Sequence, residues 1–168
     1  MTLSHIRSMA VAASAALVLA GPAPLAAQAP RTFDPVAFFT GRTSGQGFLK
    51  KVFSARQATR VTGAGHVEGG TLVLDQRVAI AGEPTRTRQW RLRQVGPARW
   101  SGTLSDAKGP VVASAAGPVL TIAYTSDQGM GVAQTVTLAP DGRSARNRMR
   151  IRKLGVTVAT IDETIVRE

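Results

Sequence analysis

The chain has 168 residues, 21 lysines and arginines against 10 aspartates and glutamates, and a formal net charge of +11. This length corresponds to about one domain. It has no cysteine and only two histidines, which excludes disulfide scaffolds, cysteine-ligated zinc or iron–sulfur sites and cysteine nucleophiles. It also lacks a phosphate-binding glycine loop and a G-x-S-x-G motif, so we expect no metal, no cofactor and no catalytic residue.

Residues 1–27 form a predicted Sec-type signal peptide. Within it, residues 9–20 are an uninterrupted run of small and apolar side chains that is too short to span a bilayer as a stable helix. Small residues place the cleavage site near Ala27 or Ala29. We therefore expect residues 28–168 to form a single domain that is located in the periplasm or secreted.

After the predicted signal, one helix precedes a long succession of strands. Asp34 can cap a helix whose first position is Pro35, and Gly41 is expected to end it. From Gly45 onward, short alternating runs rich in Val, Thr, Ile, Arg and Gln are separated by Gly, Pro and Asp-Gly turns. The predicted strands cover residues 46–55, 58–66, 71–81, 85–95, 98–105, 109–116, 119–126, 130–139, 144–153 and 156–167.

Ten consecutive short strands with tight connections predict an antiparallel up-and-down meander. A meander of this length must hide its edge strands, and a closed barrel does so. We therefore predict an all-β, lipocalin-like or calycin-like barrel of about eight to ten strands with a short N-terminal helix. Such a barrel has room for one small ligand unless side chains fill it completely.

Short motifs in a fixed order carry a resemblance to a known family. They are Phe33-Asp34-Pro35, Phe38-Phe39-Thr40-Gly41, Leu72-x-Leu74-Asp75, Arg88-x-Trp90, Trp100-x-Gly102, Tyr124-Thr125 and Asn147-Arg148-Met149. Together they resemble domain of unknown function 3833, a bacterial family of mostly small proteobacterial lipoproteins. The resemblance runs from Phe33 to the C-terminus and implies a lipocalin-like barrel in the cell envelope, without an established activity.

The chain departs from this family in two places. Pro22 stands where members usually carry the lipobox cysteine, so we expect that the protein is not acylated. Residues 130–139 replace a strand that is acidic and contains tryptophan in relatives, which weakens the case for any site built on that strand.

Polar residues on the apolar faces of their predicted strands define a candidate ligand pocket. By strand parity the inward set is Gln76, Arg88, Trp90, Tyr124 and Asn147, with Gln134 as a further member. This lining suits an acyl chain or another apolar molecule with an anionic or carbonyl head. The alternative is that Trp90 and Tyr124 fill the core while Arg88 and Asn147 satisfy buried backbone groups.

The predicted ninth strand also defines a basic surface patch. Its alternate residues Arg146, Arg148, Arg150 and Arg152 are expected to face water. A patch of this kind can attract anionic lipid headgroups or an anionic membrane surface. Aromatic residues make up only 5% of the chain, so few side chains can stack on bases, and we expect no nucleic-acid partner.

The acidic residues and His66 favour structural roles. Asp141 lies in a predicted turn, where aspartate bonds the local backbone, and His66 lies at a strand end near solvent. Asp162 and Glu163 are adjacent and point to opposite faces of a strand. If Asp162 faces inward, Arg88 is the expected partner, because a buried charge needs one.

These observations predict a non-catalytic protein that binds a small apolar or amphipathic, lipid-like ligand inside a barrel. The alternative is a structural or interaction protein of the cell envelope with a solid core. An exposed apolar patch would favour the interaction role, whereas a cavity would favour ligand binding. The oligomeric state has no signal in the sequence.

Overall fold

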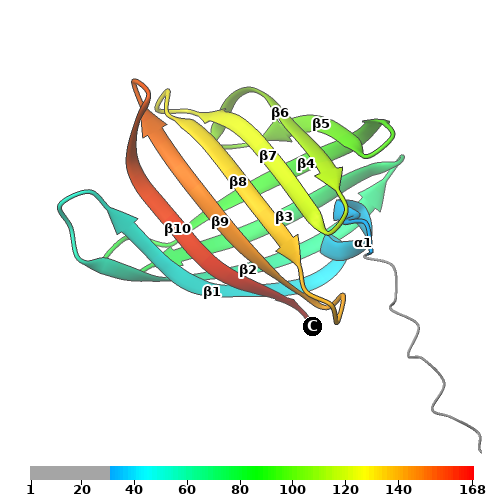
Figure 1. Ribbon diagram of the computed structural model, residues 1–168, viewed down its shortest axis with the longest axis horizontal. Helices are drawn as coiled ribbons and strands as arrows, with labels where there is room; N and C mark the ends of the chain where they lie inside the picture. The colour runs from blue at the N-terminus through cyan, green and yellow to red at the C-terminus, as the bar shows by residue number, and fades with distance from the viewer. Residues whose placement is uncertain (1–30) are drawn as a thin grey trace, which may run out of the picture.

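Ten antiparallel strands close into one barrel in the computed structural model, which describes residues 31–168 (Figure 1). Each strand pairs with its neighbours in sequence, and the last pairs with the first to close the barrel. The strands are β1 (Gly41–Lys51), β2 (Arg56–Glu68), β3 (Thr71–Ile80), β4 (Arg86–Gly96), β5 (Arg99–Leu104), β6 (Ala107–Ala116), β7 (Val119–Ser126), β8 (Gly131–Leu138), β9 (Ser144–Lys153) and β10 (Val156–Arg167). The predicted lipocalin-like meander is confirmed, and the predicted signal peptide lies outside the described residues.

The predicted strand boundaries differ from the observed ones mainly at the start of the barrel. β1 begins at Gly41 rather than residue 46, and β2 extends to Glu68 rather than residue 66. β1 starts early because the barrel is closed: Arg167, at the end of β10, pairs with Thr43, so β1 must extend at least to that residue. Among residues 31–168, no helix is long and apolar enough to span a bilayer.

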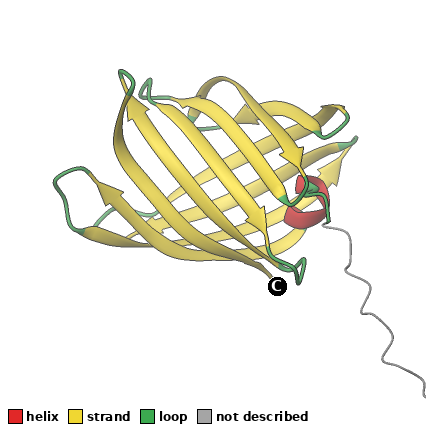
Figure 2. Cartoon of the chain, in the orientation of Figure 1, coloured by secondary structure: helices red, strands yellow, loops and turns green. Residues whose placement is uncertain are grey.

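The helix α1 (Pro35–Phe39) closes one end of the barrel, as Figure 2 shows. The Asp34 carboxylate caps it as predicted, accepting hydrogen bonds from the backbone N–H of Val36 at 2.9 Å and of Ala37 at 3.3 Å. The helix ends before Thr40, so Gly41 begins β1 rather than ending the helix. We call this side of the barrel the helix end and the opposite side the mouth.

Aromatic side chains around α1 anchor a solid core in the helix end. The rings of Phe33, Phe38 and Phe39 pack together with centroids 5.0–6.3 Å apart. They join one continuous cluster of buried side chains from the barrel wall, including Leu72, Leu74, Trp90, Leu92, Trp100, Leu104, Val111, Leu120, Ile122, Val136 and Ile165. Burial of this apolar surface is the main favourable contribution to folding.

A glycine in β2 allows α1 to lie directly against the wall. A Cβ atom on Gly65 would lie only 2.0 Å from the backbone carbonyl oxygen of Phe39, so one of the two backbones would have to move. We predict that Gly65→Ala lowers the free energy of unfolding by about 1–3 kcal/mol, as overpacked sites do. Urea denaturation measures this change. Gly131→Ala on β8 is the matched control, since a Cβ there meets nothing within 4 Å; equal losses for both variants would contradict the predicted contact.

Alternation along the strands separates a buried interior from a polar exterior. On β9, Asn147 and Met149 are buried, whereas the predicted arginine set faces water. That set is Arg146, Arg148, Arg150 and Arg152. The same parity places Gln76 of β3 and Arg88 of β4 on the interior side of the wall.

The condition for pairing Asp162 with Arg88 is not met, because Asp162 does not face inward. Asp162 lies on the outer face and accepts two hydrogen bonds from Arg146, at 2.9 and 2.7 Å. Glu163 is the residue that faces inward, as do Ile161 and Ile165 at the same spacing. The outer position gives Asp162 two neighbouring arginines, whereas Glu163 bonds Asn147, its inward-facing register partner on β9.

Candidate functional site

The mouth half of the barrel is hollow. It holds a cavity of about 410 Å³, which is within the range of small-molecule sites, roughly 300–1,000 Å³. Charged side chains form its rim, among them Lys51, Glu83, Arg86 and Asp127. The wall below the rim is an apolar belt of Leu49, Val61, Val78, Ile80, Val132, Met149, Ile151, Ala159 and Ile161.

One layer of polar side chains separates this cavity from the solid core at the helix end. On β3, β8, β9 and β10 the polar residue lies between a core residue on one side and a belt residue on the other: on β10, for example, Glu163 lies between Ile165 and Ile161. The buried apolar side chains accordingly divide into two clusters, one in each half of the barrel. The members of this polar layer are Gln76, Arg88, Tyr124, Gln134, Asn147 and Glu163, with the indole N–H of Trp90.

Gln76 organises one side of the polar layer. Its Oε1 accepts a hydrogen bond from Arg88 Nε at 2.9 Å and another from Trp90 Nε1 at 2.8 Å. The Arg88 guanidinium also lies over the Trp90 ring, 5.3 Å from the centroid. Trp90 in turn packs edge-on against Tyr124, with centroids 5.6 Å apart. These contacts hold the guanidinium at the floor of the cavity.

Glu163 and Asn147 form the other side of the layer. Asn147 Nδ2 donates a hydrogen bond of 2.9 Å to Glu163 Oε1, and both side chains are buried. Burial raises the pKa of Glu163 above its ordinary value, while the hydrogen bond from Asn147 and the positive charge of Arg88 oppose that rise. Burial likewise raises the pKa of the Tyr124 hydroxyl. The floor of the cavity therefore combines a permanent positive charge with a carboxyl group that is more easily protonated than usual.

Several buried polar atoms at this floor have no hydrogen-bond partner within residues 31–168. Asp106 Oδ1 and Thr59 Oγ1 line the mouth cavity, whereas Gln134 Nε2 and Asn147 Oδ1 lie in the polar layer against a small void of about 30 Å³. Arg88 has no carboxylate within 4.0 Å in that same part of the chain. Buried polar groups in folded proteins almost always have partners, so these atoms favour a polar molecule bound at the floor.

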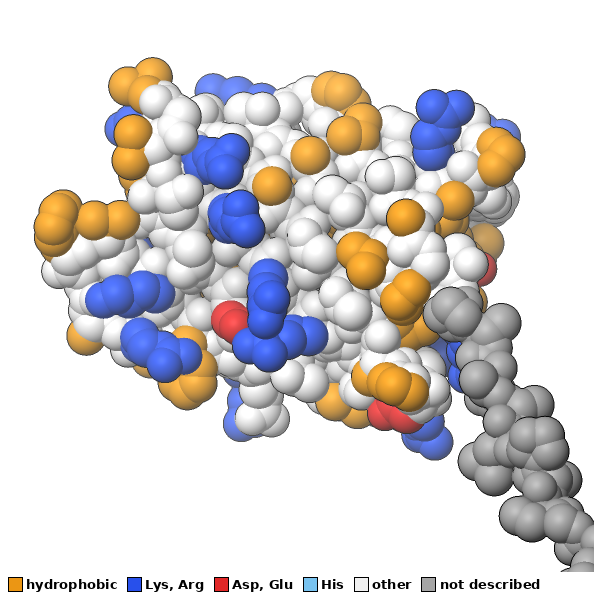
Figure 3. Space-filling view, viewed as in Figure 1, with side chains coloured by type: hydrophobic (Ala, Val, Ile, Leu, Met, Phe, Trp, Pro, Cys, Tyr) orange, Lys and Arg blue, Asp and Glu red, His pale blue; other side chains and the backbone are white. Residues whose placement is uncertain are grey.

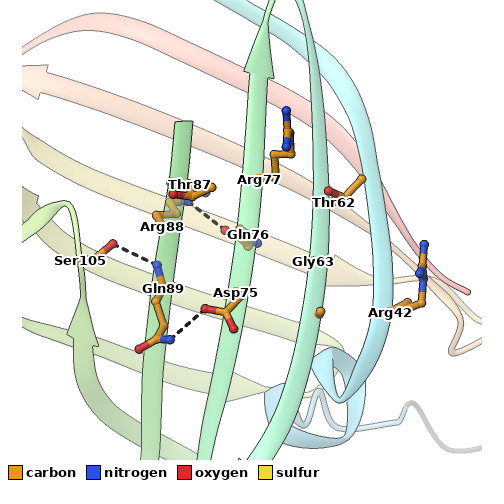
Figure 4. A pocket seen from close by; sticks show the side chains of 11 residues that line it. Arg42, Thr62, Gly63, Asp75, Gln76, Arg77, Thr87, Arg88, Gln89 and Ser105 are labelled. Atoms are coloured by element: carbon orange, nitrogen blue, oxygen red, sulfur yellow. Dashed lines mark hydrogen bonds between the residues drawn. The ribbon is translucent and has the colours of Figure 1, made fainter. Parts of the chain in front are cut away.

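The outer surface carries a second, shallower hollow over β1 to β5, which Figure 4 shows from close by. Its exposed side chains include Arg42, Asp75 and Arg77, and Gln89 donates a 2.9 Å hydrogen bond to Asp75. Within residues 31–168, no buried polar side-chain atom that lines this hollow lacks a hydrogen-bond partner. Figure 4 also shows the hydrogen bond between Arg88 and Gln76, which belongs to the interior side of the same strands.

The predicted pocket residues lie together in the polar layer. Gln76, Arg88, Trp90, Tyr124 and Asn147 all face the interior, and Gln134 joins them. Glu163 and Asp106 were missed. The inward orientation of Glu163 could have been found from its spacing with Ile161 and Ile165, whereas Asp106 lies in a turn where parity predicts nothing.

The remaining candidates lie outside the cavity. The basic patch of β9 is on the outer face, separated from the cavity by the wall. His66 is exposed at a strand end and contacts Glu68, as expected for a residue near solvent. Asp141 accepts backbone hydrogen bonds from Arg143 and Ser144, which is the turn role that was predicted. No group of three or more His, Asp or Glu side chains in the described residues is placed to hold a metal ion.

The comparisons with known proteins agree with this architecture. No curated protein matches the sequence. Among solved structures, the chain is similar to an S-type phycobiliprotein lyase, CPES, from Guillardia theta, with a TM-score of 0.61 over 79% of this chain and 90% of that chain. The two are only 5% identical, so the likeness shows the fold alone. The family model described as "Protein of unknown function (DUF3833)" matches residues 20–167, and the chain therefore belongs to the DUF3833 family.

Proposed function

We propose that this protein binds one small amphipathic, lipid-like molecule in the mouth cavity. The observation that carries the proposal is a cavity of about 410 Å³ whose wall is apolar and whose floor holds buried polar atoms without partners. An apolar body would lie in the belt, and a polar head would lie on the floor. The similarity to a phycobiliprotein lyase supports a barrel of this kind but does not carry the choice of ligand.

Arg88 favours a head that is anionic or carries a carbonyl oxygen. Its guanidinium is held by Gln76 and has no carboxylate partner among the described residues. Burial raises the pKa of Glu163, so ionisation of this carboxyl group is disfavoured at the same floor. A carboxylate or phosphate head could accept hydrogen bonds from the guanidinium, which lines the cavity.

The alternative of a solid-core interaction protein fits only half of the barrel. The helix end is filled by one continuous apolar cluster, but the mouth half encloses a space that side chains do not fill. A barrel that served only as a scaffold would gain stability from filling this space, since cavities cost free energy.

The direct test is native mass spectrometry of protein purified from its own cells, followed by extraction and identification of any bound molecule. We predict that Ala159→Phe, which places a ring in the belt, abolishes the bound mass while the protein remains folded. Thr160→Phe is the matched control, because residue 160 is exposed on the outer face of the same strand. If wild type carries no ligand and a panel of fatty acids, phospholipids and isoprenoids gives no thermal shift, the proposal is wrong.

Arg88 is expected to bind the head. We predict that Arg88→Met lowers the affinity for the extracted ligand at least about tenfold, since truncating one partner of a buried charged hydrogen bond costs about 2–5 kcal/mol. The control is Arg93→Met, on the same strand but exposed on the outer face. Isothermal titration of both variants measures the difference. Equal affinities would place the head elsewhere, without excluding the cavity as the site.

We also propose that the protein works in the periplasm or outside the cell. The proposal is supported by the predicted signal peptide and by the absence of cysteine, which is compatible with that compartment. The test is mass spectrometry of the N-terminal peptide after fractionation of the cells. A mature chain that begins at Gln28 or Pro30 in the periplasmic fraction is expected, and an intact N-terminus in the cytoplasmic fraction would overturn this location.

A further inference from the structure

Two neighbouring hairpins at the mouth present apolar side chains to solvent. The β1–β2 turn carries Val52 and Phe53, and the β9–β10 turn carries Leu154, followed by Val156 at the start of β10. Phe53 is fully exposed and Leu154 almost fully exposed. The two hairpins adjoin because β1 pairs with β10, and the backbone N–H of Val52 donates to the carbonyl oxygen of Val158 at 3.0 Å. Figure 1 shows both hairpins projecting from the same end of the barrel.

The backbone at both tips has a conformation that is unfavourable for a large side chain. Phe53 has a φ of 60° and Leu154 a φ of 49°, so each lies in the left-handed region. Large side chains are disfavoured in this region, which glycine adopts freely and asparagine often adopts. Neither side chain gains burial within the described fold. A strained backbone that exposes an apolar tip points to a function outside the folding of the barrel itself.

Basic side chains surround these two tips. They are Lys50, Lys51, Arg56, Arg150, Arg152 and Lys153, all exposed on the ends of the four strands that form the hairpins. Only Lys51 has a carboxylate partner within the described residues, Glu83 of the neighbouring turn. Figure 3 shows apolar side chains at both hairpins and blue basic side chains on the face between and below them. The charge is thus concentrated where the apolar tips project.

We propose that these two hairpins, the apolar tips, dock the protein on an anionic phospholipid bilayer. Phe53 and Leu154 would enter the interfacial region, as apolar anchors of peripheral proteins do. The surrounding lysines and arginines would contact lipid phosphates, which attract basic residues close to a negatively charged surface. A bilayer suits this surface better than a protein partner, because its most exposed apolar groups project at two hairpin tips that basic side chains surround.

Docking in this orientation also gives the cavity a source of ligand. The rim of the cavity includes Lys51 of the β1–β2 hairpin and Val158 at the start of β10. With the apolar tips in the lipid interface, the mouth faces the membrane, and an amphipathic molecule could pass between bilayer and barrel without crossing much water. This last step rests on the proposed function, whereas the docking surface stands on the hairpins alone.

The test is sedimentation of the purified protein with vesicles of phosphatidylcholine that contain phosphatidylglycerol. We expect strong binding to vesicles with phosphatidylglycerol and little to pure phosphatidylcholine. The double variant Phe53→Asn and Leu154→Asn should weaken partitioning at least about tenfold, from the loss of two apolar anchors. Because asparagine tolerates the left-handed backbone, this variant should be at least as stable as wild type in a thermal melt, so that lost binding is not lost folding.

The charges are tested separately. The triple variant Arg150→Gln, Arg152→Gln and Lys153→Gln should weaken binding about a hundredfold, since each basic residue near an anionic surface contributes about fivefold. The control removes the same net charge elsewhere on the outer surface, through Arg77→Gln, Arg93→Gln and Arg99→Gln, and should have a much smaller effect. The apolar control, Val67→Thr and Val95→Thr, changes exposed valines at the helix end.

Three results would overturn the docking surface. The first is equal binding to vesicles with and without phosphatidylglycerol. The second is an equal loss for the mouth variants and for their control variants elsewhere on the surface, which would show a non-specific effect of charge or hydropathy. The third is a dimer in solution that Phe53→Asn and Leu154→Asn convert to a monomer, because the tips would then be an interface between copies. Native mass spectrometry without vesicles tests the cavity ligand independently, so either proposal can fail alone.

Discussion

Trp90→Ala is expected to lower the free energy of unfolding by about 3–5 kcal/mol, as deletion of a buried tryptophan typically does. Trp90 is buried at the boundary between the solid core and the polar layer. Its loss removes apolar packing, the edge-on contact with Tyr124 and the hydrogen bond that Gln76 accepts at 2.8 Å. The Arg88 guanidinium also loses the ring on which it rests. We therefore expect ligand binding to fail together with stability.

A pair of tryptophan-to-phenylalanine variants separates the hydrogen bond from the packing. Trp90→Phe removes an N–H group that has a partner, whereas Trp100→Phe removes a buried N–H group that has none within residues 31–168. Gln76 Oε1 keeps its bond from Arg88, so the loss is that of one hydrogen bond, about 0.5–1.5 kcal/mol, and Trp90→Phe should be the more destabilising change. Urea denaturation of both variants measures the difference. A larger loss for Trp100→Phe would mean that packing, and not the hydrogen bond to Gln76, determines how much each tryptophan contributes to the free energy of unfolding.

The sequence predicts the barrel because most strands repeat the same alternating signal; Val73 of β3 departs from it, since it is buried although it points away from the face of Leu72 and Leu74. Alternation along β9 places Asn147 and Met149 inside and the arginines outside. On β3, Leu72 and Leu74 likewise share the inward face. Turn residues then fix the connections, and the need to hide edge strands selects closure. The inward set that includes Gln76 and Arg88 follows from the same alternation.

Other features depend on long-range geometry that alternation does not contain. Asp162 and Glu163 are chemically similar neighbours, so only their register against β9 decides which one faces Asn147 and which one faces the arginines. The docking of α1 depends on the approach of Phe39 to Gly65, residues that are adjacent only after closure. Whether the interior is full or hollow depends on the summed volumes of side chains from ten strands. No local window of sequence carries that sum.

The polar layer explains why the barrel has two different halves. Below it, aromatic rings from α1 fill the space between the walls, and above it the belt residues are aliphatic and leave a cavity. A row of amide, guanidinium and carboxyl groups at this depth is costly unless its members are satisfied. Gln76 satisfies Arg88 and Trp90, but Gln134 and Asn147 retain atoms that have no partner among residues 31–168. A bound polar head would complete the layer.

Glu163→Gln is expected to make the ligand-free protein more stable at neutral and alkaline pH and to have little effect near pH 4. Burial raises the pKa of Glu163 above its ordinary value of 4.5, so the folded state holds a proton that the unfolded state releases. The resulting stability is fully present below about pH 4.5 and is lost as the pH rises through the higher folded-state pKa. Glutamine carries no charge at any pH and can still accept the hydrogen bond from Asn147 Nδ2. Urea denaturation of both proteins from pH 4 to pH 8 should therefore give curves that converge at the acidic end and diverge as the pH rises.

The Arg88→Met background provides the control for this pH dependence. Arg88 attracts the ionised carboxylate and lowers the pKa of Glu163 against the effect of burial. Removing that attraction should raise the pKa further, so that the difference in stability between Glu163 and its glutamine variant widens in this background. If the stability curves of the Glu163 protein and its glutamine variant ran parallel from pH 4 to pH 8 in both backgrounds, the pKa of Glu163 would be the same in the folded and unfolded states. Glu163 would then be ionised in the folded protein at neutral pH. The floor of the cavity would then be neutral overall, and a ligand head with no net charge would fit it better than an anion.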